Sequence, residues 1–303
     1  MKKMQRNKML LLTGVCALGL SVAFAVNTIY HVSAASKKQP AKKEAATSVA
    51  SATESTAVAK QKPELSTLSA KKICWGQGVN FDELNRPRDA VTSQRKYGGL
   101  GGFFIDLSDT DEDAKSQPER KKIYLTFDEG YENGYTAKIL DTLKEKKVKA
   151  VFFITGDYAK REGALVRRMI DEGQVVGNHT FRHYSMPEKS LDTCREEISL
   201  LHDYVKENFG YEMNVLRPPK GEFSEQTLAL ASEMGYTTCL WSFAYKDWDV
   251  NAPGDKTQSL NKLNERLHSG GVYLLHAVSS TNAAILGDFI DSARANGYVF
   301  VTP

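Results

Sequence analysis

The sequence predicts an α/β protein built on a parallel sheet, and two observations support this class. From residue 121 to residue 303, short apolar runs alternate about seven times with longer segments that have helical spacing. The apolar runs, such as "KIYLTF" and "VYLLH", are typical of buried strands. Strands and helices that alternate in this order form a parallel sheet, which is either a barrel or a doubly wound sheet.

The individual elements follow from the apolar period and from the residues that begin and end each segment. Ile139, Leu140 and Leu143 have the spacing of one buried helix face, Ser190 is typical of a helix N-cap, and Gly173 is typical of a helix end. The expected strands are 122–127, 149–155, 174–179, 214–218, 236–242, 272–276 and 298–302. The expected helices are 134–148, 163–173, 190–210, 224–235, 257–271 and 281–297.

The N-terminus, residues 1–35, has the pattern of an export signal. A basic start is followed by an uncharged apolar run over 9–26 and by the small residues Ser33, Ala34 and Ala35. The apolar run is also just long enough to cross a bilayer, so an uncleaved signal anchor is the alternative to the cleaved signal peptide that we favour. In both cases we expect the rest of the chain to lie outside the cytoplasm, with membrane contact only through this segment.

Three further regions follow the signal. Residues 36–72 are mostly Ala, Ser, Thr, Lys, Gln and Glu without an apolar period, which predicts a disordered linker. Residues 73–120 are less regular and are interpreted as an N-terminal extension of the folded domain at 121–303. Residues 1–72 contain 12 Lys/Arg and 3 Asp/Glu, which leaves 28 basic against 34 acidic residues for the remainder. This mildly acidic balance argues against a nucleic acid as the partner.

Four polar residues follow apolar strands directly, and this placement predicts a functional site. They are Asp128, His179, Arg217 and His276. In parallel α/β folds the carboxyl ends of the strands meet at one rim, where active sites are built, whereas structural charges are spread over helix surfaces. We therefore expect these four side chains to come together.

The segments "TFDEGYENG" and "HTFRH" suggest a metal site. His179 and His183 are four residues apart, which can bring two imidazoles to one side of a tight loop, and Asp128 and Glu129 offer carboxylates at a neighbouring strand end. The alternatives are a solvated turn or a cluster of ion pairs for the carboxylates, and two polar loop residues for the histidines. Zinc is the first choice for such ligands, and Mn, Co or Ni fit them as well. His276 is interpreted as a general acid, with a core histidine as the alternative.

Five motifs in order, "TFDEG", "HTFRH", "RPPKG", "DW" and "LLH", resemble the polysaccharide deacetylases of carbohydrate esterase family 4 over 121–303. The resemblance implies a distorted (β/α) barrel of about seven strands with an irregular N-terminal extension. It also implies one divalent metal ion and the removal of N- or O-acetyl groups.

The resemblance further assigns a role to each matching position. His179, His183 and Glu129 would be the metal ligands. Asp128 would be the catalytic base, held in place by Arg217. His276 would be the catalytic acid, with Asp247 as its partner. Trp248 would wall the acetyl pocket, and the backbone N–H of Lys220 would face the oxyanion. Glu129 departs from the family's usual Asp, and Lys220 departs from its common Tyr.

These departures, with "GYENGYT" and "LLHAVSSTNA", resemble the branch that deacetylates N-acetylmuramic acid in peptidoglycan, whose product cyclises to the muramic δ-lactam of spore cortex. The Lys220 cation has a physical reason here, because it can pair with the lactyl carboxylate that N-acetylglucosamine lacks. The leading hypothesis is therefore a monomeric, exported deacetylase that acts on peptidoglycan glycan strands. Alternatives are an N-acetylglucosamine, chitin or xylan deacetylase and a non-catalytic wall-binding relative.

Overall fold

The structure, a computed structural model, describes residues 64–108 and 121–303. Its described residues form one nine-stranded sheet in which β2, β8, β6, β5, β4, β3, β10 and β9 are neighbours in this order, with β11 paired to β3. All pairings in this sheet are parallel. The strands are β2 (Gly102–Phe103), β3 (Lys121–Glu129), β4 (Val151–Ile154), β5 (Val175–Asn178), β6 (Val215–Leu216), β8 (Thr237–Cys239), β9 (Phe243–Ala244), β10 (Gly271–His276) and β11 (Tyr298–Val301).

The sheet is a curled half-barrel, which confirms the distorted (β/α) barrel expected from the sequence. Its two ends, β2 and β9, do not pair with each other in the described part of the chain. The seven expected strands are present, and the two additional strands, β2 and β9, have only two residues each. Strands of this length have no readable period, so the sequence pattern could not indicate them.

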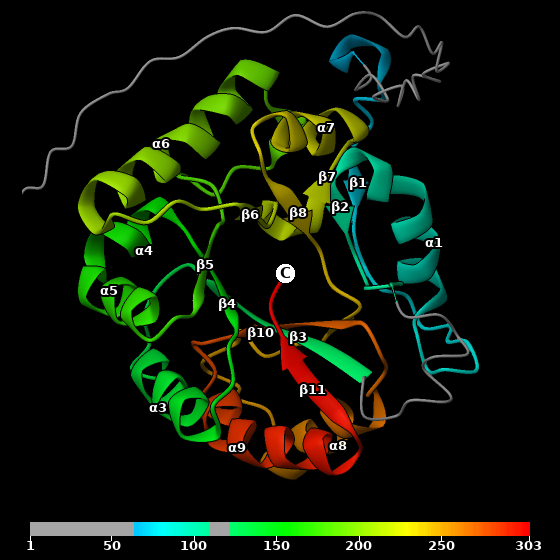
Figure 1. Cartoon of the computed structure of the whole chain (residues 1–303), viewed down its shortest axis with the longest axis vertical. Helices are drawn as coiled ribbons and strands as arrows, with labels where there is room; N and C mark the ends of the chain where they lie inside the picture. The colour runs from blue at the N-terminus through cyan, green and yellow to red at the C-terminus, as the bar shows by residue number, and fades with distance from the viewer. Residues whose placement is uncertain (1–63, 109–120) are drawn as a thin grey trace, which may run out of the picture. The chain divides into compact units, whose positions relative to one another are not determined.

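Helices surround the outer side of the sheet (Figure 1). They are α3 (Thr136–Lys146), α4 (Gly156–Arg161), α5 (Gly163–Asp171), α6 (Leu191–Phe209), α7 (Glu225–Glu233), α8 (Lys256–Glu265) and α9 (Ser280–Ala295). Their ends follow the expected local chemistry: the Ser190 side chain accepts a hydrogen bond from the Thr193 N–H at the start of α6, and Gly210 ends α6 with φ of 67°. Ser224 and Thr227 form a capping box on α7.

Strand β3 separates the two sides of the sheet. Ile123, Leu125 and Phe127 pack in the main core between the sheet and the helices, whereas Tyr124 packs in a second apolar cluster on the inner side. Side chains alternate between the two faces of a strand. The same alternation therefore directs Asp128 inward and Glu129 toward the helices.

The N-terminal extension is attached to the domain at two places. Its first strand, β1 (Ile73–Cys74), pairs antiparallel with β7 (Glu222–Phe223), and β2 joins the main sheet beside β8. Between them lies α1 (Arg88–Tyr97), a helix that the irregular composition of this region did not predict.

The expected linker boundary at residue 73 needs a correction. Residues 64–72 lie against α7: the backbone carbonyl of Leu65 accepts from Gln226 at 3.1 Å, and the Ser69 N–H donates to Glu225 at 3.2 Å. Leu65 packs on the main core. A single apolar residue in a polar segment gives no sequence pattern from which this contact could be predicted. Residues 1–63, which include the expected signal or anchor, lie outside the described residues. Among the described residues, no helix combines the length and the apolar character that crossing a bilayer requires.

Candidate active site

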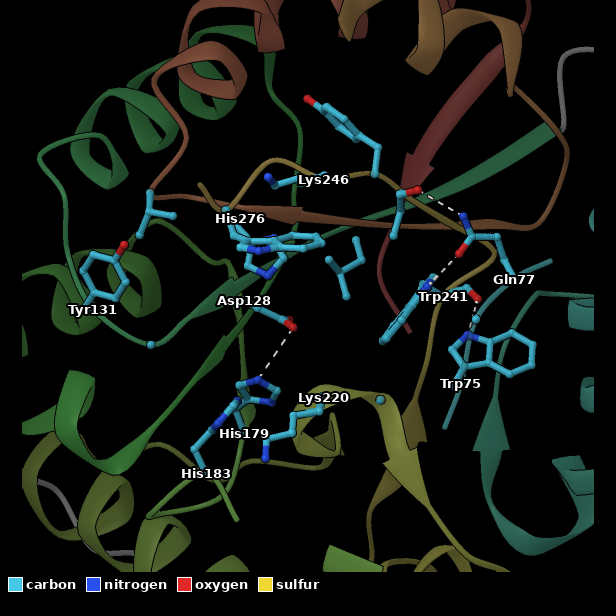
Figure 2. A pocket seen from close by; sticks show the side chains of 18 residues that line it. Trp75, Gln77, Asp128, Tyr131, His179, His183, Lys220, Trp241, Lys246 and His276 are labelled. Atoms are coloured by element: carbon cyan, nitrogen blue, oxygen red, sulfur yellow. Dashed lines mark hydrogen bonds and ion pairs between the residues drawn. The ribbon is translucent and has the colours of Figure 1, made fainter. Parts of the chain in front are cut away.

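A cavity of about 930 Å³ opens where the strands of the half-barrel end. Among its lining residues are six that the sequence analysis singled out, and Figure 2 shows His179, His183, Lys220 and His276 grouped around Asp128. These six are Asp128, His179, His183, Lys220, Trp248 and His276. The cavity thus brings together residues from β3, β10 and three loops, as the placement at strand ends predicted.

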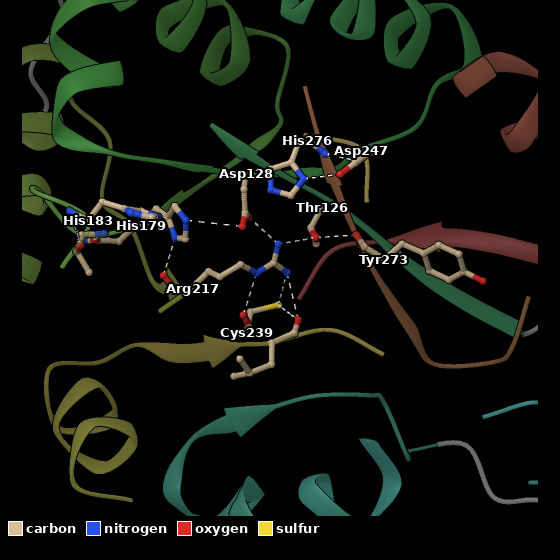
Figure 3. A network of polar contacts seen from close by, with 12 residues as sticks. Thr126, Asp128, His179, His183, Arg217, Cys239, Asp247, Tyr273 and His276 are labelled. Atoms are coloured by element: carbon tan, nitrogen blue, oxygen red, sulfur yellow. Dashed lines mark hydrogen bonds and ion pairs between the residues drawn. The ribbon is translucent and has the colours of Figure 1, made fainter. Parts of the chain in front are cut away.

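Asp128 is held by a fully buried arginine. Arg217 Nη1 donates to Asp128 Oδ1 at 2.8 Å, and the other guanidinium N–H groups donate to Thr126 and to the carbonyl groups of Cys239 and Leu240 (Figure 3). Burial raises the pKa of Asp128, but the charge and hydrogen bond of Arg217, together with the nearby His179 and His276, outweigh burial and lower that pKa below its ordinary value. Asp128 is therefore ionised at neutral pH, and its second oxygen, Oδ2, is directed to the cavity side.

The two histidines of "HTFRH" are brought together by an unusual loop. Their ring centroids are 4.8 Å apart. Thr180 and His183 have φ values of 61° and 58°, which non-glycine residues rarely adopt and which cost about 1–3 kcal/mol each. Side-chain hydrogen bonds offset this cost, because the Thr180 N–H donates to Asn178 Oδ1 at 2.9 Å and the His183 N–H donates to Thr180 Oγ1 at 3.1 Å.

The orientation of His179 fits a metal ligand. Its Nδ1 lies 2.8 Å from the carbonyl oxygen of Arg217, which can only accept, so Nδ1 carries the proton. Its Nε2 therefore presents a lone pair, and it lies 3.6 Å from Asp128 Oδ2. Burial lowers the pKa of His179, which keeps the imidazole neutral. The unprotonated Nε2 of a neutral imidazole is the atom that can bind a metal cation.

A complete set of protein ligands is not formed in the described residues, where no group of three or more His, Cys, Asp and Glu side chains is arranged to hold a metal ion. His179 and His183 supply two imidazoles, and both line the cavity. These two residues fit a divalent ion, with the remaining positions open to water or substrate.

Glu129 is not part of this group, which corrects the expectation that it is the third ligand. Its side chain is completely buried on the helix side of β3, where Oε1 lies 3.3 Å from Thr136 Oγ1 and Oε2 has no hydrogen-bond partner. The physical reason is that β3 continues to Glu129, so neighbouring side chains point to opposite faces of the strand. Burial raises the pKa of Glu129 well above its ordinary value.

His276 is oriented by Asp247. Its Nδ1 donates to Asp247 Oδ1 at 2.7 Å, and its backbone N–H donates to Oδ2 at 2.8 Å. Buried Asn282 also donates to Oδ2, at 2.6 Å, and accepts a hydrogen bond from the Tyr245 hydroxyl. Burial lowers the pKa of His276, but the hydrogen bond and the charge of Asp247 outweigh burial and raise that pKa above its ordinary value. The free Nε2 of His276 can thus carry a proton at neutral pH.

Lys220 and Trp248 lie on the rim of the cavity. Lys220 has φ of 61° between Pro219 and Gly221, and its side chain is exposed. In the described part of the chain, Lys220 forms no ion pair, whereas Lys246 in the same cavity lies 3.1 Å from Asp249. Trp248 is 52% exposed, and its ring stands edge-on to His276 with centroids 5.6 Å apart.

The lining residues that the sequence analysis missed include five with large or polar side chains. They are Trp75, Gln77, Tyr131, Trp241 and Lys246. Trp75 and Gln77 belong to "CWGQG" in the N-terminal extension, where a tryptophan between polar and glycine residues was the available signal. Tyr131 is 51% exposed in the loop after β3, two residues after Glu129 in the sequence.

The arrangement is that of an acid–base hydrolase: an ionised carboxylate, a protonatable imidazole held by its own carboxylate, and two further imidazoles share one cavity. The sequence matches the family described as polysaccharide deacetylase over residues 115–239. The peptidoglycan-N-acetylmuramic acid deacetylase PdaA of Bacillus subtilis (strain 168) is 42% identical over 183 residues, which are 60% of this chain and 70% of PdaA.

One further relative and one solved structure also match this chain. A 30.6 kDa protein of Geobacillus stearothermophilus, described as uncharacterized, is 46% identical over 235 residues, 77% of this chain and 84% of its own length. The solved structure of Bacillus subtilis PdaA, described as a family 4 carbohydrate esterase, has a TM-score of 0.70 at 35% identity and covers 78% of this chain and 96% of that one. The chain belongs to the polysaccharide deacetylases of carbohydrate esterase family 4, which confirms the resemblance that the five motifs indicated.

Proposed function

We propose that this protein is an exported, metal-dependent enzyme that removes the N-acetyl group from N-acetylmuramic acid in peptidoglycan glycan strands. The relative PdaA is described as a peptidoglycan-N-acetylmuramic acid deacetylase, which supports this choice of reaction and sugar. Relatives described as peptidoglycan-N-acetylglucosamine deacetylases match as well, so the choice of sugar rests on this chain's own cavity.

The chemistry follows from the partners of Asp128 and His276. Asp128, ionised because Arg217 holds its other oxygen, takes a proton from the water that attacks the acetyl carbonyl carbon. When the C–N bond breaks, His276 donates a proton to the leaving nitrogen, while Asp247 stabilises the imidazolium. The products are acetate and the free amine. This proposal includes the role of Asp128 as the base, positioned by Arg217, and that of His276 as the acid, oriented by Asp247.

His179 and His183 would hold the divalent ion, with zinc as the first choice and Mn, Co or Ni as alternatives. When bound, the ion lowers the pKa of a coordinated water and polarises the acetyl carbonyl oxygen. The backbone N–H of Lys220 is the proposed donor to the oxyanion, and Trp248 is the proposed wall beside the acetyl group.

The observation that carries the choice of muramic acid is the Lys220 side chain. It lines the cavity together with His179 and His183, and it forms no ion pair within the residues that the structure describes. A cation that has no ion-pair partner among the described residues and lies beside an acetyl site suits a substrate that carries a carboxylate on the same sugar. N-acetylmuramic acid has this carboxylate on its lactyl group when no stem peptide is attached, and N-acetylglucosamine never has it.

The setting of the reaction is proposed from the sequence and from this substrate. Residues 1–35 support export across the membrane, as a cleaved signal or as an anchor, and the glycan strand is then the partner outside the cytoplasm. A deacetylated muramic acid can close to its δ-lactam, so spore cortex is the proposed location of the product. We further propose that the enzyme acts as a monomer.

The test measures acetate release from three substrates: peptide-free glycan strands, strands with stem peptides, and N-acetylglucosamine oligomers. We expect the highest kcat/KM on the peptide-free strands, with the free amine located on muramic acid by mass spectrometry. Lys220→Gln should lower this value about tenfold, because a charge-assisted contact is lost. Lys246→Gln is the matched control, because Asp249 already compensates this second cavity lysine. Equal rates on N-acetylglucosamine oligomers would overturn the choice of sugar, and no acetate from any substrate after metal addition would overturn the activity.

A further inference from the structure

The N-terminal extension contributes residues to the active-site cavity. Trp75, Gly76 and Gln77 line it together with Asp128 and His276, although they precede the family match at 115–239. Figure 2 shows Trp75 and Gln77 on one side of Asp128 and Tyr131 on the other. The cavity therefore extends beyond the reacting acetyl group in two directions, and the extension forms one of its ends.

The residues at this end are held in fixed orientations by hydrogen bonds. Trp75 Nε1–H donates to the carbonyl oxygen of Trp241 at 2.9 Å, and Trp241 Nε1–H donates to Gln77 Oε1 at 3.0 Å. Gln77 Nε2–H donates in turn to the carbonyl oxygen of Ala244 at 3.0 Å. Both indole N–H groups are thus satisfied within the protein, so the rings offer apolar surface to a ligand.

Contacts with Gly221 also hold Trp75 and Trp241 in position. The pairing of β1 with β7 leads directly to Trp75, whose N–H donates to the Gly221 carbonyl oxygen at 3.0 Å. The Trp241 ring lies over Gly221, where a Cβ would come within 2.5 Å of the ring. Gly221 has φ of 67° and follows Lys220 directly. Trp75 and Trp241 both contact Gly221, so their positions are fixed relative to Lys220, the residue that we propose to bind the lactyl group.

A cavity of about 930 Å³ is near the upper end of the roughly 300–1,000 Å³ range of pockets that enclose a whole ligand. In the proposed function, the reacting acetyl group and its sugar take the part of the cavity around Asp128, which leaves the end at Trp75 for another group. A pyranose ring has an apolar C–H face and a hydroxylated edge. Indole surface suits the face, and Gln77 retains one amide N–H and one acceptor lone pair for a hydroxyl group.

We propose that Trp75, Gln77 and Trp241 form a subsite for the sugar next to the deacetylated residue in the same glycan strand. This inference rests on the proposed function, because it takes a glycan strand as the substrate. It makes the N-terminal extension part of substrate binding, and it gives the enzyme a preference for oligosaccharides over short fragments.

The experiment compares a peptide-free tetrasaccharide with a disaccharide, using the full chain loaded with zinc. The measured quantity is the ratio of kcat/KM for the longer substrate to that for the shorter one. We expect Gln77→Ala and Trp75→Leu each to lower this ratio about tenfold relative to the wild type, mainly through KM of the tetrasaccharide. Val79→Ala is the matched control, because Val79 belongs to the same segment, is 84% exposed and lies outside the cavity lining. It should leave the ratio unchanged.

The outcomes separate a subsite from a structural contact. Trp75 also packs edge-on against Phe104, with centroids 4.7 Å apart, so its replacement can lower Tm, whereas Gln77→Ala removes no such ring contact. An unchanged ratio for Gln77→Ala, or equal losses on both substrates, would overturn the subsite. The same ratio measured on N-acetylglucosamine oligomers tests the subsite separately from the proposed choice of N-acetylmuramic acid. A length-dependent loss on those oligomers, without activity on muramic acid, supports the subsite and refutes the proposed sugar.

Discussion

Asp128 and Glu129 are neighbours in the sequence, but their carboxyl groups lie on opposite faces of β3. Asp128 lies in the cavity and binds Arg217 at 2.8 Å, whereas Glu129 is completely buried beside Thr136 on the helix side. One carboxyl group is thus kept ionised by a cation, and the other is driven by burial toward its neutral form. The pair of acids in "TFDEG" therefore has two different physical roles.

Burial of Glu129 predicts a pH-dependent stability. Its pKa in the folded protein is raised well above the ordinary value of 4.5, so the folded state binds a proton that the unfolded state has released. The contribution of protonated Glu129 to the free energy of unfolding is fully present below pH 4.5. It is lost as the pH rises toward the pKa of Glu129 in the folded protein. Glu129→Gln cannot ionise, so its free energy of unfolding relative to the wild type should increase between pH 5 and pH 8. Urea unfolding at both pH values measures this, and a constant difference would contradict it.

Metal binding should depend on the histidines and not on Glu129. Glu129→Gln should bind zinc with nearly the affinity of the wild type, because its side chain lies outside the cavity. His183→Ala should lose more than the roughly 10–100-fold that removal of an outer-shell partner costs, because it removes one of two imidazoles. Calorimetric titration of metal-free protein with zinc measures both. A large loss for Glu129→Gln would show that this carboxylate reaches the metal in the loaded enzyme.

The placement of Asp128, His179, Arg217 and His276 near strand ends could be predicted because each follows an apolar run that indicates a buried strand. The position of Glu129 could not, because the expected strand stopped at residue 127 and left both acids in a turn, whereas β3 continues to Glu129. Two more residues in the strand impose the alternation that separates them.

Other differences also have physical causes. Trp75 and Gln77 reach the cavity through the two-residue pairing of β1 with β7, a tertiary contact without a sequence period. The helix expected at 257–271 includes His268, but α8 ends at Glu265, and His268 is buried with its Nε2 2.8 Å from Ser242 Oγ. Short strands and helix ends are where local patterns carry the least information.

Asp128→Asn should reduce the rate and preserve the fold. The asparagine carbonyl can still accept from Arg217, so the buried guanidinium keeps a partner, but the general base is lost. We expect kcat to fall by about 10²–10⁴, and Tm to fall less than in Arg217→Met, because the hydrogen bond from Arg217 is kept. Acetate release and thermal unfolding measured on one preparation test this. Activity near that of the wild type in a folded variant would refute the role of Asp128 as base.

Arg217→Met should have the complementary effect on stability. Arg217 is completely buried and contacts the Phe153 ring at 4.2 Å in addition to its hydrogen bonds, so its loss leaves Asp128 buried without a cation. Removing one partner of a buried ion pair costs about 3–5 kcal/mol. Chemical denaturation measures this cost. Asp128→Asn serves as the comparison, because it should cost much less, and equal stability of Arg217→Met and the wild type would contradict the expectation.

Asp247 should set the alkaline limit of activity through His276. Burial lowers the pKa of His276, and the Asp247 hydrogen bond at 2.7 Å together with its charge raises that pKa above 6.5. His276 acts as an acid only while protonated, so activity is present below this pKa and is lost as the pH rises through it. Asp247→Asn removes the charge but leaves the burial, so the alkaline limb of kcat/KM should move to lower pH. Asp249→Asn is the control, because Asp249 contacts Lys246 at 3.1 Å and makes no hydrogen bond to His276 in the described residues. An alkaline limb that stays in place in Asp247→Asn would show that another group supplies the proton to the leaving amine.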